Sequence, residues 1–354
     1  MRERGVSLQL KRGAPAAMLA VAVVAACVMM ASGIAAGEAA CHLVRVAEWP
    51  IRLERNQLIV DGAVNQKPVG VKLDTGATRT IVLRPAALKL DLTLRRTRGR
   101  MFGIGGEAEL ELAFVDELRI GEITRENWRM LVAGGQERGD GVAVLLGEDF
   151  LHKFDVEFDL AHKLVRLHRP EHCDGMSLAY WAAEGVSAVE IDPVDEGRPQ
   201  IVLTVRVNGQ PVRALLDSGA ESSMLTTHDA AAAGITPETP GVVAIGQLGG
   251  LGRKAVATWV GPFKSVAIGN ERFIDTALPF ADLYRDATYT PLGSLVPRRM
   301  ETLQPMLLGV DFLRAHRVLV AHSQRRIYFT YGGGPVFKWA GAVGGPLPGV
   351  DAQP

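Results

Sequence analysis

The sequence has no excess of either charge. Its 354 residues include 39 lysines and arginines and 39 aspartates and glutamates, so the formal net charge is +0. It has no long acidic or basic run and no low-complexity tract. A nucleic-acid partner would require a basic face, which this composition does not offer. We therefore expect no nucleic-acid partner, and a globular chain, 47% hydrophobic, long enough for two domains.

Cysteine is scarce as well, with three residues in the whole chain. The one cluster of metal-binding side chains is His168, His172 and Cys173. No second ligand pair at a suitable spacing accompanies it, so we interpret this stretch as a solvated linker rather than a metal site. We expect no metal and no cofactor.

The first 37 residues differ from the rest of the chain. Four basic residues and one acidic residue occupy positions 1–13, and positions 14–37 are apolar, rich in alanine and uncharged. This pattern is typical of an export signal cleaved near Ala36 or Gly37. The apolar stretch also approaches membrane-spanning length, so an uncleaved anchor is one alternative. Cys27 suggests a lipoprotein signal as another, although it lies in the middle of the apolar run. We expect an exported protein, periplasmic or secreted, with possible membrane anchoring through this segment.

Two cysteines lie outside that segment. Without residues 1–37 the chain has a net charge of −3, because four basic residues and one acid are removed, and it keeps Cys41 and Cys173. In an oxidising compartment these two are a candidate disulfide. The alternative is two unpaired thiols, since the sequence says nothing about their distance.

The sequence repeats itself. The segment LLGEDFL at 145–151 returns as LLGVDFL at 307–313, with six of seven positions identical. Upstream of each copy, LDTGA at 73–77 is matched by LDSGA at 216–220. The second copy is longer, with 92 residues from its Asp to its Gly against 73 in the first. We therefore predict a duplicated domain in which Asp74 has Asp217 as its counterpart.

Both copies have mainly β patterns. Runs such as QLIVDGAV, AELELAFV, IVLTVRV and ATWVGPFKSVAI alternate or are rich in β-branched residues. NGQP at 208–211 predicts a hairpin turn, and short helices are predicted at 226–234 and at the start of GEDFL and GVDFL. The β pattern breaks at 168–185. We expect these parts: signal or anchor 1–37, first lobe 45–170, linker 171–185, second lobe 186–332 and an extended or mobile glycine- and proline-rich tail 333–354.

Two Asp-Thr/Ser-Gly loops on a pseudo-twofold axis have a defined chemistry. Carboxylates held within about 3 Å cannot both ionise and share one proton. The ionised Asp can act as general base on water, and the protonated Asp can hydrogen-bond the substrate carbonyl. Thr75 and Ser218 have hydroxyls that can hydrogen-bond across the axis. Gly76 and Gly219 allow close backbone approach.

At these residues the sequence resembles the retropepsin-like and pepsin-like aspartic peptidases. The resemblance rests on 74–77, 217–220 and the two apolar-apolar-Gly segments ending at Gly147 and Gly309. It implies an all-β fold of two duplicated retropepsin-like β-barrel lobes related by a pseudo-twofold axis, with few short helices. Both lobes lie on one chain, so it also implies an active site within a monomer.

The family closes a glycine-bearing hairpin flap over its substrate. The resemblance places one candidate flap at Ile104, Gly105 and Gly106, and its counterpart at Gly246, Gly249 and Gly250. Neither segment has the tyrosine usual in pepsin-like flaps, which favours a retroviral-style arrangement. Ordinary turns are the alternative for both segments.

Other motifs favour simpler interpretations. Asp149 and Asp311 recur two residues after the apolar-apolar-Gly segments, and we interpret them as helix-start or capping residues. Ser218 is not in a Gly-x-Ser-x-Gly elbow, which argues against a serine hydrolase. Residues 103–106 lack the context of a dinucleotide fingerprint.

The leading hypothesis is an aspartic endopeptidase that cuts extended polypeptide segments at an Asp74/Asp217 dyad. The alternative is a non-catalytic module on the same fold that binds a peptide or an envelope component. A third possibility is hydrolysis restricted to one partner protein. The insertion at 284–305 is expected to narrow or gate the site.

Overall fold

The computed structural model describes residues 40–135, 141–193, 199–252, 255–284, 288–289, 296, 298–299 and 306–339. The chain divides into two units, Met1–Ala40 and Cys41–Pro354. The predicted signal or anchor segment therefore lies outside the described residues. Within the described residues, no helix is both long enough and apolar enough to cross a membrane.

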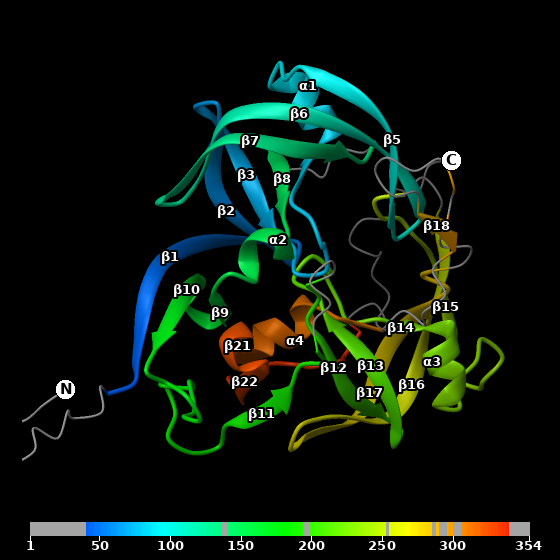
Figure 1. Cartoon of the computed structure of the whole chain (residues 1–354). Coiled ribbons are helices and arrows are strands. Elements are labelled where there is room, and N and C mark those ends of the chain that lie inside the picture. The colour runs from blue at the N-terminus through cyan, green and yellow to red at the C-terminus, as the bar shows by residue number, and fades with distance from the viewer. Residues whose placement is uncertain are drawn as a thin grey trace, which may run out of the picture. The chain divides into compact units, whose positions relative to one another are not determined.

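The unit Cys41–Pro354 consists mainly of strands with a few short helices (Figure 1), which confirms the all-β prediction. The first half contains β1 (His42–Glu54), β2 (Gln57–Val64), β3 (Lys67–Leu73), β4 (Ile81–Leu83), α1 (Arg84–Lys89), β5 (Leu94–Gly103), β6 (Gly106–Ile120), β7 (Ile123–Ala133), β8 (Val142–Leu146), α2 (Glu148–Leu151), β9 (Asp155–Asp159), η1 (Leu160–His162) and β10 (Leu164–Glu171). The second half contains β11 (Ser187–Glu190), β12 (Val202–Val207), β13 (Gln210–Leu216), β14 (Leu225–Thr226), α3 (Thr227–Ala232), β15 (Val243–Leu248), β16 (Val256–Ile268), β17 (Glu271–Ala281), β18 (Thr288–Tyr289), β19 (Arg298–Arg299), β20 (Met306–Leu308), α4 (Val310–Ala315), β21 (His316–Ala321), η2 (His322–Gln324) and β22 (Arg326–Tyr331).

The two halves pair their strands in the same way. The β2–β3 hairpin corresponds to β12–β13, the long β6–β7 hairpin to β16–β17, and β5–β6 to β15–β16. In each half the strand before the Asp loop runs parallel to the strand of the apolar-apolar-Gly segment, as β3–β8 and as β13–β20. The predicted duplication is therefore a duplication of topology. Closure of each lobe into a barrel stays a prediction.

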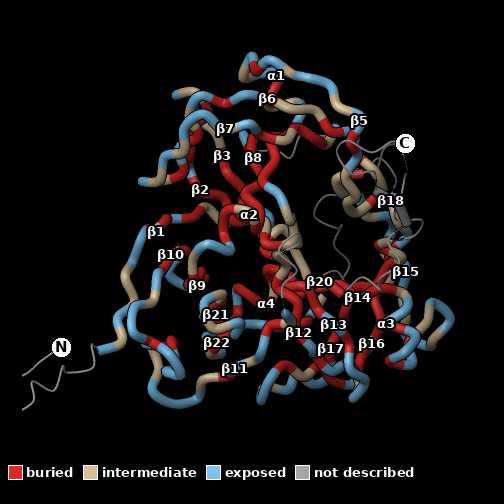
Figure 2. Tube along the Cα trace, in the orientation of Figure 1, coloured by how far each residue is buried: buried red, intermediate tan, exposed pale blue. Residues whose placement is uncertain are grey.

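A shared sheet joins the halves. Six strands follow the order β11-β22-β21-β9-β10-β1, three from each half, and the halves meet where β9 pairs antiparallel with β21. Phe158 is opposite Val318 at that junction, and both are fully buried. One cluster of buried apolar residues includes members of both halves, which Figure 2 shows as buried segments in both lobes. Because burial of apolar surface drives folding, we expect the two lobes to fold as one unit.

The same sheet contains a buried carboxylate. Glu157 of β9 accepts hydrogen bonds from Arg166 and His168 of β10, from Arg317 of β21 and from Tyr180. Burial alone would raise its pKa, but the bonds from His168 and Tyr180 and the charge of Arg317 lower the pKa to about 2. An ion pair between Arg317 and Glu157 thus holds the second half to the first.

Most of the predicted local elements are present. The run QLIVDGAV is β2, and the predicted helix at 226–234 is α3, whose N-cap Thr226 accepts a hydrogen bond from the Asp229 N–H. The predicted turn at 208–211 joins β12 to β13 through Asn208 and Gly209, both with positive φ (50° and 85°) as a tight hairpin requires.

One local prediction is wrong. His168 is not in a solvated linker, because β10 continues to Glu171 and buries the histidine against Glu157. In the described part of the tail, Val336 and Phe337 are buried and the Phe337 carbonyl accepts from the Ala277 N–H of β17 (2.8 Å). Residues 340–354 lie outside the described residues.

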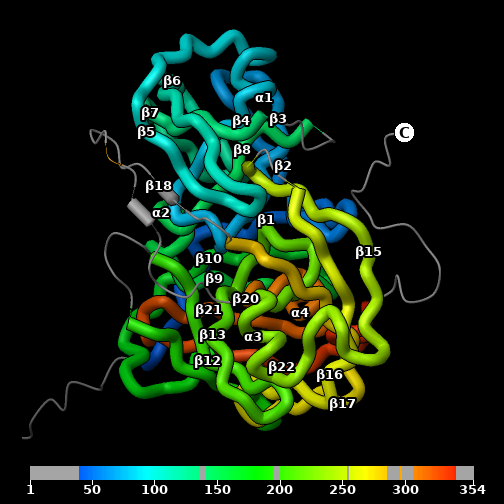
Figure 3. Tube along the Cα trace, turned by 90° about the vertical axis from the view of Figure 1, so that its right-hand side faces the viewer, coloured from blue at the N-terminus to red at the C-terminus, as the bar shows by residue number. Residues whose placement is uncertain are grey.

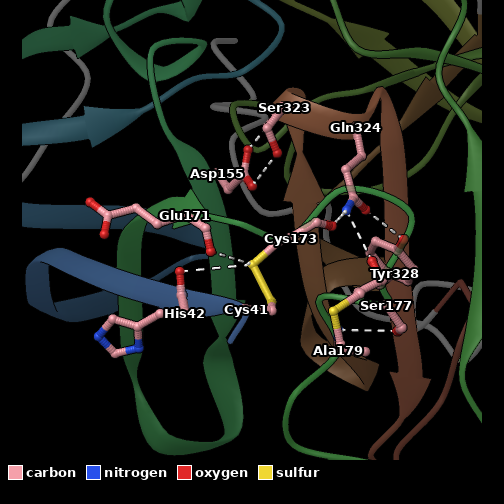
Figure 4. The surroundings of a disulfide bond; sticks show 11 residues. Cys41, His42, Asp155, Glu171, Cys173, Ser177, Ala179, Ser323, Gln324 and Tyr328 are labelled. Atoms are coloured by element: carbon pink, nitrogen blue, oxygen red, sulfur yellow. Dashed lines mark hydrogen bonds between the residues drawn. A yellow bond between two sulfur atoms is a disulfide. The ribbon is translucent and has the colours of Figure 1, made fainter. Parts of the chain in front are cut away.

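Cys41 and Cys173 form a disulfide (Figure 4). It ties the residue before β1 to the second residue after β10, at an end where His42 of β1 pairs with Glu171 of β10. The bond closes a loop of 132 residues, and loops of that order give a chain-entropy stabilisation of about 4–5 kcal/mol.

Candidate active site

Asp74 and Asp217 occupy equivalent places at the ends of β3 and β13. The Asp74 N–H donates to the Leu146 carbonyl of β8 (3.0 Å), and the Asp217 N–H donates to the Leu308 carbonyl of β20 (2.9 Å). The apolar-apolar-Gly strands therefore fix the backbone of both aspartates. Oδ1 of Asp74 accepts from the Ala77 N–H (3.0 Å), and Oδ1 of Asp217 accepts from Gly219 (2.8 Å) and Ala220 (3.1 Å).

Each carboxylate lies against the glycine of the opposite loop. A β-carbon added to Gly76 would lie 2.5 Å from Oδ1 of Asp217, and one added to Gly219 would lie 2.5 Å from Cγ of Asp74. Any side chain at these two positions would displace the opposite carboxylate. The two glycines are therefore required by the close approach of the loops, which brings both carboxylates to one place.

The residues after the aspartates interlock the loops. The Thr75 N–H donates to Oγ of Ser218 (3.0 Å), and the Ser218 N–H donates to Oγ1 of Thr75 (2.9 Å). The Thr75 hydroxyl in turn donates to the Leu216 carbonyl (2.7 Å). Both side chains are buried away from water, so without these hydrogen bonds their polar groups would have no partner.

A second layer of hydrogen bonds supports each loop, and sequence reasoning missed it. Oδ1 of Asp149 accepts from the N–H and the hydroxyl of Thr80, and Oδ1 of Asp311 accepts from the same two groups of Ser223. Both aspartates lie in the first turn of their helix, which confirms the predicted helix-start position, but neither side chain caps its own helix. A comparison of the repeats would have found the pattern, because Thr80 and Ser223 are both six residues after their aspartate.

The hydroxyls of that layer also hold the apolar-apolar-Gly segments. The Gly147 N–H donates to Oγ1 of Thr80 (3.1 Å), and the Gly309 N–H donates to Oγ of Ser223 (2.9 Å). Each Asp loop, its apolar-apolar-Gly segment and the following helix thus form one hydrogen-bonded unit.

The electrostatics of the site differ between the halves. Burial, and next the charge of Asp74, raise the pKa of Asp217 to about 7, against lowering contributions from the Gly219 N–H and from Lys72. Burial also raises the pKa of Glu148 well above its usual value, with Asp149 and Asp74 adding to the effect. Burial and the charge of Asp217 raise the pKa of Tyr284. The pair is therefore expected to hold a proton on Asp217 below about pH 7.

The two candidate flaps meet. The β5–β6 hairpin turns at Ile104 and Gly105, and the β15–β16 hairpin turns after Leu248 (Figure 3). The Gly252 N–H donates to the Ile104 carbonyl (2.9 Å). A β-carbon at Gly250 would lie 2.5 Å from Cβ of Ile104. The small residues thus allow contact between the tips.

The six predicted flap residues have different places in these hairpins. Gly105 and Gly106 have positive φ (87° and 104°), as a tight turn at the tip requires. Gly249 and Gly250 lie in the opposite tip. Gly246 lies within β15 at a register shift against β16, so it is a bulge residue and not part of the tip.

The insertion at 284–305 lies mostly outside the described residues. At its start, the ring of Tyr284 lies 6.1 Å from that of Phe102 in the first flap. Further on, β18 pairs with β19 and lies beside β5 and β6. The described part of the insertion, which belongs to the second half, therefore contacts the flap of the first.

The remaining predicted candidates do not form a site. Within the described residues, no group of three or more His, Cys, Asp and Glu side chains could hold a metal ion. Cys173 is in the disulfide and His168 is bonded to Glu157. Lys72 and Glu148 are two charged residues near the loops that sequence reasoning missed. Their repeat counterparts, Leu215 and Val310, are apolar.

The chain is similar to known aspartic proteases in both halves. The sequence model of the family described as aspartyl protease matches residues 60–150 and 202–312, more than half of the chain. None of the curated proteins matches this sequence. Among solved structures, a retropepsin-like aspartic protease from Rickettsia conorii is similar at 19% identity over 37% of this chain and 95% of that chain (TM-score 0.27). An aspartic proteinase from Irpex lacteus is similar at 12% identity over 85% of this chain and 99% of that chain (TM-score 0.44).

Proposed function

The chain belongs to the aspartyl protease family, and we propose that it is an aspartic endopeptidase with Asp74 and Asp217 as its catalytic pair. The observation that carries the proposal is the approach of the two loops, in which each carboxylate lies against the glycine of the other loop. Reciprocal hydrogen bonds between Thr75 and Ser218 hold that arrangement. Such preorganisation is what catalysis by a shared-proton pair requires.

The two carboxylates have different roles in this proposal. Asp217 is 8% exposed and has a pKa raised to about 7, so it keeps the proton and donates it to the oxygen of the scissile carbonyl. Asp74 carries the negative charge and accepts a proton from the attacking water, whose oxygen bonds to the carbonyl carbon. When the tetrahedral intermediate collapses, the C–N bond breaks, the proton on Asp74 goes to the leaving amine, and the hydroxyl formed from the carbonyl returns its proton to Asp217 as the C=O bond forms again. No covalent enzyme intermediate forms.

The two hairpins support the proposed substrate class. Flaps whose tips touch must open to admit a chain and close on it afterwards, which suits an extended polypeptide segment. Both aspartates are in one chain, so we propose that the monomer is active. The disulfide and the N-terminal sequence support export to an oxidising compartment, periplasmic or extracellular, with the N-terminal segment as signal or anchor.

The test compares wild type with Asp74→Asn and Asp217→Asn on unfolded proteins and a peptide library. We expect each substitution to lower kcat/KM by about 10²–10⁴-fold, the usual contribution of a general base or acid. Asp116→Asn, at an exposed position of β6, is the matched control and is expected to keep full activity.

Equal cleavage by all three proteins would contradict the proposal. A wild type that binds peptides without cleaving them, with binding that survives both substitutions, would instead identify a binding module. Cleavage confined to one protein from the same cell would narrow the substrate rather than change the chemistry.

A further inference from the structure

One position beside the two loops breaks the repeat. Lys72 precedes Asp74 by two residues, and the corresponding residue before Asp217 is Leu215. Leu215 belongs to a buried apolar cluster. Lys72 is 3% exposed, and its strand partners in β2 and β8 are the buried Ile59 and Leu145. An ammonium group therefore occupies a place where the other lobe has a leucine. Burial of a charge is costly unless the charge has a partner.

Lys72 has such a partner in the opposite loop. Residues 72 and 74 are on the same face of the chain as it leaves β3, because side chains alternate along a strand. From that face, Nζ of Lys72 donates to the Gly219 carbonyl (2.9 Å). Gly219 is the glycine against which the carboxylate of Asp74 lies.

The same peptide unit reaches Asp217. The Gly219 carbonyl and the Ala220 N–H belong to one peptide bond, and that N–H donates to Oδ1 of Asp217 (3.1 Å). Lys72, the peptide and Asp217 thus form a continuous chain of hydrogen bonds. In such a chain each bond polarises the next, so the ammonium strengthens the N–H donor that faces the carboxylate.

The charged and titratable groups around the pair come from several elements. Lys72 comes from β3, Glu148 from α2 with Asp149 behind it, and Tyr284 from the segment after β17. Glu148 and Tyr284 are held towards their neutral forms by burial. Lys72 is the cation among these groups.

We propose that Lys72 is a positioning residue for the catalytic pair, which fixes the Gly219–Ala220 peptide and sets the pH range of the reaction from the first lobe alone. This inference rests on the proposed function. The positive charge favours the ionised form of Asp217 and of the pair as a whole. With Lys72 in place, the pair loses its first proton, and so becomes singly charged and active, at a lower pH than it would if residue 72 were a leucine like Leu215.

The expected effect of removing Lys72 has a definite sign. Lys72 lowers the pKa of Asp217, so Lys72→Leu should raise it. Both limbs of the pH profile of kcat/KM should then move to higher pH by about one unit, the size expected for one nearby charge in a partly screened site. A purely structural role would lower kcat/KM at every pH without moving the limbs.

Three variants separate charge from packing. Lys72→Leu makes the first lobe resemble the second, Lys72→Arg keeps the charge, and Leu215→Met changes packing at the equivalent position without charge. We expect the shifted profile in Lys72→Leu only, with Lys72→Arg close to wild type. Superimposable profiles for wild type and Lys72→Leu, or the same shift in Lys72→Arg, would overturn the proposal. If Lys72→Leu does not fold, Lys72→Met carries the same test with an unbranched neutral chain.

A titration without substrate keeps this test independent of activity. In protein labelled with ¹³C at the aspartate carboxyl groups, NMR follows the titration of Asp217 in wild type and in each variant, with Asp217→Asn to assign its signal. We expect the pKa of Asp217 to rise by about one unit in Lys72→Leu. An unchanged pKa would overturn the role of Lys72, whereas a wild type that cleaves nothing while this shift is present would overturn only the proposed function.

Discussion

In the first lobe Lys72 precedes the Asp74 loop and Glu148 follows the apolar-apolar-Gly segment, whereas the second lobe has Leu215 and Val310 at these positions. The hydrogen bonds that hold the loops are nevertheless the same in both lobes, from Thr80 and Asp149 in one to Ser223 and Asp311 in the other.

The two lobes have kept equivalent hydrogen bonds around their loops but not equivalent charges. Two equivalent carboxylates in equivalent surroundings would share a proton equally. Different surroundings favour the proton on one of them, and in the proposed pair burial, which raises the pKa of Asp217 to about 7, favours Asp217. The two lobes thus share the hydrogen bonds that hold their loops but differ in the charged residues nearby. That difference is enough to give the two aspartates the different roles proposed for them.

The largest effect is expected at Gly76 and Gly219, where the two loops approach each other in the same way. Gly76→Ala and Gly219→Ala each place a methyl group 2.5 Å from atoms of the opposite aspartate. We expect both to lower kcat/KM by about 10³-fold or more and by similar amounts, because displacement of either carboxylate removes general acid–base catalysis. Peptide cleavage measures the effect, with Gly135→Ala, whose β-carbon meets open space, as the control. A large effect at one glycine only would show that the lobes are not equivalent in geometry.

The raised pKa of Asp217 predicts that the stability of the protein depends on pH. The folded pKa of Asp217 is raised to about 7 from 3.8, so ionisation above pH 3.8 costs folding free energy progressively until about pH 7. We expect Asp217→Asn to be more stable than wild type at pH 8 by about 2–4 kcal/mol, and the gain to vanish near pH 3. Urea unfolding at both pH values measures it. A gain that is equal at pH 3 and pH 8 would argue against ionisation as its cause.

The lobes should also differ in how much each interlocking hydroxyl contributes. Thr75 makes two bonds through its hydroxyl, accepting from the Ser218 N–H and donating to the Leu216 carbonyl. The Ser218 hydroxyl accepts from the Thr75 N–H. We expect Thr75→Val to cost about 2–3 kcal/mol and Ser218→Ala about 1–2 kcal/mol, since each leaves buried groups unpaired. Urea unfolding measures both, with Thr75→Ser expected to remain near wild type. Equal costs would mean that the donation to Leu216 contributes little.

The repeat in the sequence was enough to predict the pairing of the lobes, because Asp74 and Asp217 each have the same neighbours in the chain. It also predicted the β2 and β12 strands and the turn at Asn208, which depend on local alternation and turn chemistry. The resemblance to aspartic peptidases, which the family match supports, then predicted that the two loops face each other across a pseudo-twofold axis.

What could not be predicted depends on the distance between segments far apart in the chain. Lys72 reads as an ordinary strand residue until Gly219, 147 residues later, is placed beside it. His168 looked like part of a polar linker, because its partners Glu157 and Tyr180 come from other segments of the chain. Asp149 looked like a helix cap because its true partner, Thr80, is 69 residues earlier. In each case a local pattern was outweighed by a tertiary contact.

The smallest predicted difference between the lobes concerns the short helices beside the loops. In α3 the hydroxyl of Thr226 accepts from the Asp229 N–H (3.0 Å), whereas α1 begins at Leu83 without a side-chain cap and has a proline in its first turn. We expect Thr226→Ala to lower the free energy of unfolding by about 1 kcal/mol, the usual value for loss of an N-cap, with Thr226→Ser close to wild type. Urea unfolding measures both. If Thr226→Ala costs nothing, α3 is held as α1 is, by burial of one alanine on its inner face, Ala230 in α3 and Ala87 in α1. The cap would then be a difference in sequence without a difference in stability. The charges near Asp74 and Asp217 would remain as the difference between the lobes that bears on the proposed reaction.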